Sequence, residues 1–113
     1  MTGTFLQAPV KLDVETFTAA AVDVDITETP MVLHTVELQL SAGATTSELA
    51  TVKAVTGSNS RTLAEFDPST TAETTITFDF GVGRGIGSKE KLTVDYTNTD
   101  GSNITVVTAY MPY

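Results

Sequence analysis

Residues 78–91, FDFGVGRGIGSKEK, are rich in glycine and contain one arginine, Arg84. Glycine-rich loops bind phosphate in nucleotide enzymes, where the loop follows a strand and opens a helix. The required G-x-G-x-x-G spacing fails here, because Ile86 or Ser88 occupies the third glycine position. The next residues, KLTVDY, predict a strand rather than a helix. We therefore expect a strand that ends at Phe80 and then a pliable loop, with Arg84 at its tip able to bind a carboxylate of a neighbouring protein.

The only histidine, His34, would act as a general base only beside a serine nucleophile and an acid. It lies in VLHTVEL, in register with Val36 and Leu38, and the chain has no nucleophile-elbow motif. A single histidine in a chain without cysteine also makes a poor transition-metal site. We therefore expect a packed or interface histidine, no catalytic residue and no enzyme activity.

The segment DYTNTDG partly matches a calcium-binding loop. Asn98, Asp100 and Gly101 fit the middle of the EF-hand pattern, but Tyr96 stands at the first ligand position and no glutamate closes the loop. Asp-Gly is also a common hairpin turn without metal. The sequence leaves calcium binding by this loop open, and it predicts no other metal and no cofactor.

Two acidic runs, LDVE and VDVDITE, place carboxylates at alternate positions. Paired carboxylates cleave glycosidic bonds in many sugar hydrolases. Such enzymes usually also have aromatic platforms for the sugar, and this chain has no tryptophan. We interpret the carboxylates of Asp13, Glu15, Asp23 and Asp25 as solvated strand faces that keep a sheet edge soluble.

Composition and charge restrict the function further. A net charge of −8 repels phosphate, so we expect no nucleic-acid partner. No apolar run approaches the roughly 18 residues that a membrane span needs, and the first residues lack the pattern of a signal peptide. We therefore expect no membrane partner and assembly in a cytoplasm. Without cysteine, stability must come from packing, hydrogen bonds or neighbouring subunits.

Apolar and polar residues alternate along almost the whole chain, as is typical of half-buried strands, and no segment predicts a convincing helix. The alternating segments are 10–17, 22–27, 32–40, 49–55, 62–66, 74–80, 91–96 and 104–110. Their spacing predicts an all-β fold, a single β-sandwich of about 7–8 antiparallel strands with a jelly-roll or immunoglobulin-like topology. A length of 113 residues fits one domain. We expect a sandwich at residues 10–113 and an N-terminal arm at residues 1–9.

Three stretches together resemble small all-β structural proteins of bacteriophage virions. They are VLHTVELQLSAGATTSELATV (32–52), EFDPST (65–70) and KLTVDYTNTDGSNITVVTAY (91–110), about two thirds of the chain. Members of this family often carry a Gly-Asp pair before the penultimate strand, where this chain has SKEK. The resemblance implies a jelly-roll-like or immunoglobulin-like sandwich in a virion, and it implies no catalytic residues.

The resemblance favours a capsid decoration or cement protein, which binds the outer surface of the major capsid shell and stabilises it. Its partners would be the major capsid protein or other virion proteins, and further copies of itself, with a trimer favoured. A phage tail, neck or fibre-attachment module and a carbohydrate-binding β-sandwich module are the alternatives. The residues expected to contact partners are Phe5, Leu6, Arg84, Ile86, Tyr110, Met111 and Tyr113. For the C-terminal residues, packing of the last strand in its own core is the competing interpretation.

Overall fold

The computed structural model describes residues 10–113 of the chain. It contains eight strands and one short 3-10 helix, η1. Their bounds are β1 Lys11–Thr18, β2 Val22–Ile26, β3 Met31–Leu40, β4 Ala50–Thr56, β5 Asn59–Phe66, η1 Pro68–Thr70, β6 Thr75–Ile86, β7 Lys91–Tyr96 and β8 Asn103–Pro112. Each alternating segment of the sequence forms a strand, which confirms the expected all-β fold.

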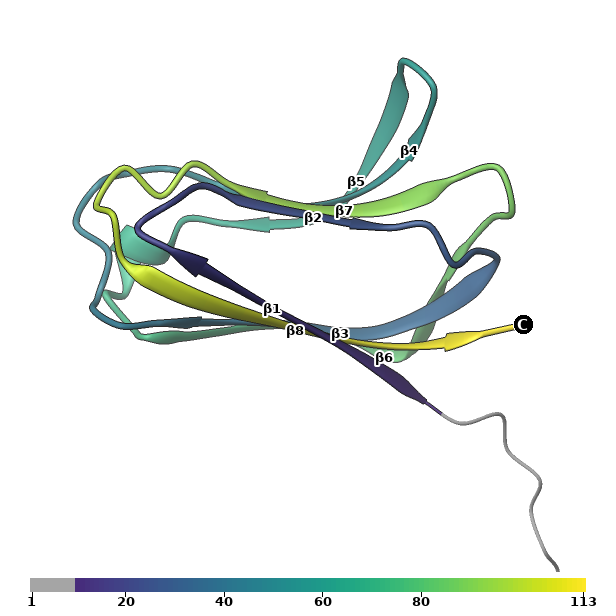
Figure 1. Cartoon of the computed structure of the whole chain (residues 1–113), viewed down its shortest axis with the longest axis horizontal. Helices are drawn as coiled ribbons and strands as arrows, with labels where there is room; N and C mark the ends of the chain where they lie inside the picture. The colour runs from purple at the N-terminus through teal and green to yellow at the C-terminus, as the bar shows by residue number, and fades with distance from the viewer. Residues whose placement is uncertain (1–9) are drawn as a thin grey trace, which may run out of the picture.

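The strands form two antiparallel sheets of four strands that pack face to face (Figure 1). We call the sheet β1-β8-β3-β6 sheet A and the sheet β2-β7-β4-β5 sheet B. The first strand pairs with the last, β2 pairs with β7, β3 with β6 and β4 with β5. The chain therefore resembles one long hairpin rolled up into a sandwich, which is the strand order of a jelly roll. This order distinguishes between the two topologies that the alternation left open.

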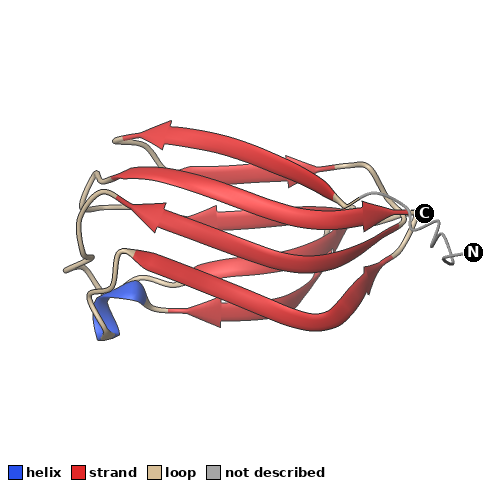
Figure 2. Ribbon diagram, turned by 90° about the horizontal axis from the view of Figure 1, so that it is seen from below, coloured by secondary structure: helices blue, strands red, loops and turns tan. Residues whose placement is uncertain are grey.

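The core lies between the sheets and is filled by aliphatic side chains from both of them. Strands β7 and β8 run through the middle of their sheets, as Figure 2 shows for sheet A. β8 buries alternate residues as expected, and β7 buries Thr93 in addition to Leu92, Val94 and Tyr96. The largest fully buried side chains are Met31, Leu33, Leu38, Ile86, Leu92 and Ile104. The interior is therefore a packed core.

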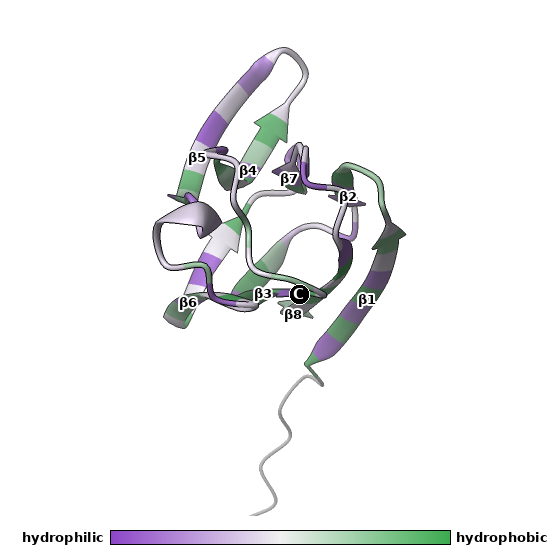
Figure 3. Cartoon of the chain, turned by 90° about the vertical axis from the view of Figure 1, so that its left-hand side faces the viewer, coloured by the Kyte–Doolittle hydropathy of each residue, from purple (hydrophilic) through white to green (hydrophobic). Residues whose placement is uncertain are grey.

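Strand β1 turns its acidic side chains toward the interior and its apolar side chains toward solvent, contrary to the expectation. Its inward side chains are Asp13, Glu15 and Phe17, which lie opposite the buried residues of β8. Its apolar residues face outward, so Leu12 is 65% exposed and Val14 is 58% exposed. Figure 3 shows the alternation of hydrophilic and hydrophobic residues along this strand. The interpretation of Asp13 and Glu15 as a solvated face is therefore wrong, because alternation alone does not say which face of an edge strand points inward.

A bulge in β3 changes the face assignment of that strand. Leu33 pairs with Tyr110 and Thr35 pairs with Ala109, so His34 is an extra residue opposite β8. Across the bulge, Leu33 faces the core, as Met31 does. His34 is half-buried and is out of register with Val36, contrary to the expectation from alternation.

Candidate interaction surface

The glycine-rich segment is the second half of an edge strand. Strand β6 continues to Ile86 and pairs with β3 on both sides of an irregularity. Leu33 pairs with Arg84 and Thr35 with Asp79, so residues 80–83 lie opposite the single residue His34. The expected strand end at Phe80 is therefore wrong, because pairing with β3 resumes after the glycines. The irregularity is a large β-bulge in the free edge of sheet A, which also discourages edge-to-edge pairing.

Two glycines allow the shape of this bulge. Gly81 has a φ of 64° and Gly83 a φ of 126°, both in the region that favours glycine. A Cβ on Gly83 would lie 2.1 Å from Val32 Cγ1. The backbone N–H of Gly81 donates to Asp79 Oδ1 over 2.8 Å, which fixes the start of the bulge. The side chain between the two glycines, Val82, is 98% exposed, so the bulge presents an apolar tip.

The turn after β6 is held by an ion pair. The Arg61 guanidinium donates through Nε to Glu90 Oε2 over 2.8 Å and through one terminal nitrogen to Glu90 Oε1 over 2.9 Å. The same arginine donates to the carbonyl oxygen of Gly85, and the backbone N–H of Gly87 donates to Glu90. These contacts lower the pKa of Glu90 to about 2. The SKEK turn is thus fixed by β5, contrary to the expected pliable loop.

The sequence-predicted contact residues separate into exposed and buried groups. Arg84 is exposed, and no ion pair or side-chain hydrogen bond involves it within residues 10–113. Ile86 is fully buried and Tyr110 is 7% exposed, so both belong to the core rather than to a surface. The Tyr110 hydroxyl donates to Glu28 Oε1 over 2.7 Å, and burial followed by this contact raises the pKa of Tyr110 to about 12.

The C-terminal residues are more accessible. Met111 is half-buried, while Tyr113 is 69% exposed and donates its backbone N–H to the carbonyl of Pro30. The expected contacts Phe5 and Leu6 lie outside the residues that the structure describes. Val82 was missed, although an apolar residue between two glycines indicates an exposed tip.

Three segments that are far apart in the sequence meet at one end of sheet A. Met111 pairs with Val32, Gly85 pairs with Val32 from the other side, and Lys11 pairs with Tyr110. The end of β8 and the bulged half of β6 therefore flank the start of β3, and the start of β1 lies on the other side of β8 (Figures 1 and 2). We call this region the contact end of sheet A; its exposed or half-buried members are Val10, Val82, Arg84, Met111 and Tyr113.

The suspected calcium loop uses its oxygens within the protein. Asp100 accepts hydrogen bonds from the backbone N–H and hydroxyl groups of Thr45 and Thr46, and these donors hold the pKa of its carboxyl well below the usual range. The side chain of Asn98 bonds to Ala20 and Ser102 and is 5% exposed. Both residues thus stabilise the turn: Asp100 ties it to the β3–β4 connection, and Asn98 supports a φ of 58°.

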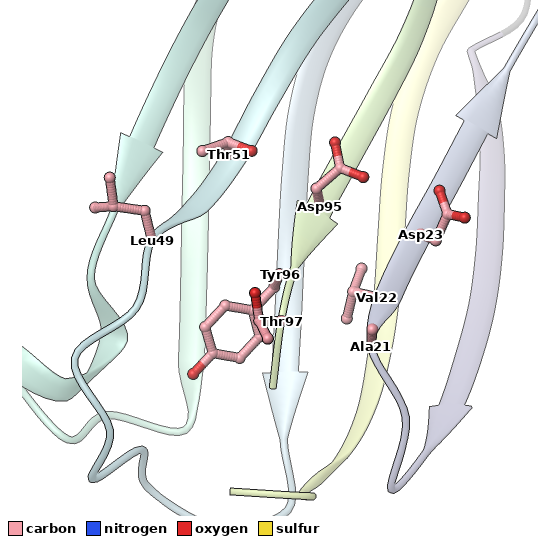
Figure 4. A pocket seen from close by; sticks show the side chains of 8 residues that line it. All are labelled: Ala21, Val22, Asp23, Leu49, Thr51, Asp95, Tyr96 and Thr97. Carbon is pink, nitrogen blue, oxygen red and sulfur yellow. The ribbon is translucent and has the colours of Figure 1, made fainter. Parts of the chain in front are cut away.

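The acidic runs lie on two different surfaces. Asp13 and Glu15 point inward from β1, and a side-chain hydrogen bond between them, followed by burial, raises the pKa of Glu15 to about 7. The outward residues Asp23 and Asp95 are opposite each other on β2 and β7, and both line an open pocket of about 420 Å³ on sheet B. Figure 4 shows their carboxylates with Thr51 at this pocket. Its aromatic residue, Tyr96, is 2% exposed and offers no stacking platform for a sugar ring.

Within residues 10–113, no group of three or more histidine, cysteine or acidic side chains is arranged to hold a metal ion. The described part of the chain also has no helix with the length and hydrophobicity to cross a membrane. The chain matches no known protein family, and no curated protein matches it. A function must therefore be inferred from the surface of the protein. The main features of this surface are the contact end and the outward apolar residues of β1.

Proposed function

We propose that the chain is a structural protein of a bacteriophage virion, a decoration or cement protein that binds the outside of the major capsid shell. The observation that carries this proposal is the convergence at the contact end. An attachment surface needs accessible groups that act together, and here an apolar tip and a cation on β6 lie at the same end of sheet A as an aromatic residue that follows β8. Val82, Arg84 and Tyr113 supply them. Aromatic residues and arginine are enriched at protein interfaces.

The fold supports the same proposal. Jelly rolls are a recurrent architecture of viral capsid domains, and they are also found in lectins and cupins. A packed interior suits a protein that stabilises an assembly by surface contact. A cation at the contact end fits a partner that presents carboxylates, and bidentate pairing would then orient the domain on that partner. The proposal includes self-association of the chain, for which the sequence favours a trimer.

The tail or neck alternative uses the same surface and differs in location. The carbohydrate-binding alternative would use the pocket on sheet B, because lectins share the jelly roll and the pocket is polar at Asp23, Thr51 and Asp95. The buried position of Tyr96 argues for the contact end over this pocket.

The stoichiometry and position of the chain in purified virions test the proposal. We expect the chain in the particles in a fixed ratio to the major capsid protein that matches the capsomer lattice. Antibody labelling in electron micrographs should decorate the whole shell. Labelling confined to one vertex would support the tail or neck module instead. Purified virions that lack the chain would overturn the virion assignment, and binding to a glycan array would then favour the carbohydrate module.

A further inference from the structure

The outer face of sheet A carries a stripe of exposed apolar side chains on β1 and at the residue just before it. Val10 is 54% exposed, Leu12 is 65% exposed and Val14 is 58% exposed. Single exposed apolar residues are common on proteins, but three at alternate positions of one segment form a contiguous patch. These residues alternate with inward carboxylates, so the strand exposes its apolar side and covers its charged side.

The stripe continues across the sheet onto β8 and β3. Leu12 pairs with Ala109 and Val14 pairs with Val107, and all four point outward. At the contact end, Met111 pairs with Val32 of β3. We call this surface the apolar face; its members are Val10, Leu12, Val14, Val32, Val107, Ala109 and Met111.

We propose that the apolar face packs against the same face of a second copy of this chain, in a two-fold pair. This inference rests on the self-association included in the proposed function and does not depend on a location in a virion. Two outer faces of sheet A would then stack as sheets do inside a β-sandwich, about 10 Å apart. A two-fold pair differs from the threefold arrangement favoured from the sequence.

Charge supports a second copy as the occupant. Copies with a net charge of −8 repel each other, so they can associate only through a surface that is nearly free of charge. Among the outward residues of β1, β8 and β3, the only acidic one is Glu37, and it accepts a hydrogen bond from Gln39 Nε2. The outer face of sheet B carries Asp23, Asp25 and Asp95 and is unsuited to such contact.

The distribution of exposed apolar residues indicates that the face meets itself. The other large apolar side chains exposed in residues 10–113 are Leu49, Val82 and Tyr113. They lie on separate segments, so no second patch of comparable size complements the apolar face in the described part of the chain. A surface whose best complement is itself gives an isologous, two-fold interface.

The free edge of β1 does not favour strand addition as an alternative. Asp13 and Glu15 point inward along this edge, and a new strand would cover their carboxylates further. Inward-pointing charges are one of the devices by which sheets avoid edge-to-edge pairing. Contact through the face leaves these carboxylates where they are.

The size of the face fits a modest interface. The three strands that form the apolar face, with about eight residues each, project an area of roughly 400 Å² at the usual strand spacing and rise. A standard interface buries about 800 Å² on each partner, so this face supplies about half of one side, as in a weak pair. We therefore expect dissociation constants of about 1 µM to 100 µM.

Sedimentation equilibrium of the whole chain tests the inference. We expect the wild-type chain to form dimers in a concentration-dependent way, and to dimerise more strongly at high salt, which screens the repulsion between like-charged copies. Leu12→Glu and Leu12→Lys should each weaken dimerisation at least about tenfold, because every substitution occurs on both sides of the interface and places charge at its centre. Leu49→Glu, at a similarly exposed apolar residue outside the face, is the matched control and should dimerise as the wild type does.

The two substitutions of Leu12 separate apolar contact from charge. If Leu12→Glu weakens the dimer while Leu12→Lys strengthens it, repulsion alone explains the result and the inference is wrong. Dimerisation of both variants with wild-type affinity would place self-association on another surface. A wild-type chain that stays monomeric up to about 1 mM would overturn self-association as well. None of these outcomes bears on occupancy of virions, which tests the proposed function separately. Circular dichroism confirms that each variant is folded.

Discussion

At the scale of the single residue, Glu15 is a half-buried carboxylate that points inward from an edge strand. Its hydrogen bond to Asp13, together with burial, raises its pKa from 4.5 to about 7 in the folded chain. The folded protein therefore binds more protons than the unfolded chain between these pH values, so the free energy of unfolding should fall as the pH rises through this window. Glu15→Gln keeps a neutral hydrogen-bonding group but cannot titrate. We expect the free energy of unfolding of this variant to fall much less with pH than that of the wild type. Urea unfolding at several pH values from 4.5 to 8 measures the difference.

A second carboxylate provides the control for this measurement. Glu65 lies exposed on β5, and Glu65→Gln removes one negative charge without touching the pair on β1. This variant should keep the wild-type decline. If the free energy of unfolding of Glu15→Gln falls with pH as steeply as that of the wild type, the extra proton of the folded state is not bound by the Asp13–Glu15 pair. The buried atom Asp13 Oδ2 accepts no hydrogen bond from another group of the described residues. When Glu15 is protonated, its carboxyl group becomes a hydrogen-bond donor to the Asp13 carboxylate.

At the scale of the element, the bulge of β6 depends on Gly83. Alanine there would combine a φ of 126° with a Cβ placed 2.1 Å from Val32 Cγ1. We expect Gly83→Ala to lower the free energy of unfolding by about 1–3 kcal/mol and the melting temperature by roughly 5 °C or more. Thermal unfolding followed by circular dichroism measures this change.

The matched control lies two residues further along the same strand. A Cβ on Gly85 would meet nothing closer than the Tyr113 hydroxyl at 4.0 Å. Gly85→Ala should therefore leave the melting temperature within about 2 °C of the wild type. Equal losses in both variants would mean that the bulge is not under steric constraint at Gly83.

The positions of the strands could be predicted from the sequence, but not which face of every strand points toward the core. Strand β7 buries Leu92, Val94 and Tyr96 as alternation predicts, because a central strand has one core face along its whole length. Strand β1 could not be assigned in this way, because its apolar side faces outward. In β3, the extra residue His34 shifts the phase, and no single-sequence pattern marks such a bulge. Strand order depends on pairing between distant segments, which period-two alternation does not encode.

At the scale of the whole molecule, the sequence indicates single residues of the candidate surface, and only the fold shows that they lie together. The sequence indicated Arg84 and Tyr113 separately, and the jelly-roll order places both beside the start of β3. Ile86 and Tyr110 were assigned to the surface because alternation cannot show that they pack between the sheets. The apolar face shares Val10 and Met111 with the contact end and leaves Val82, Arg84 and Tyr113 outside it. A two-fold pair would therefore hold these remaining groups of two contact ends in a fixed relation. Two linked attachment surfaces bind more tightly than one when both can engage.

The proposed attachment of the contact end to a capsid shell leads to a prediction about Arg84. Arg84 is exposed and carries no ion pair within residues 10–113, so Arg84→Glu should leave the melting temperature of the isolated chain unchanged. If its guanidinium pairs with a carboxylate of the shell, the reversed charge should lower affinity for undecorated shells about tenfold or more. Co-sedimentation of the purified chain with shells measures this loss. Lys53→Glu changes the net charge equally on sheet B and should bind as the wild type does; equal losses in both variants would reflect overall charge and remove Arg84 from the interface.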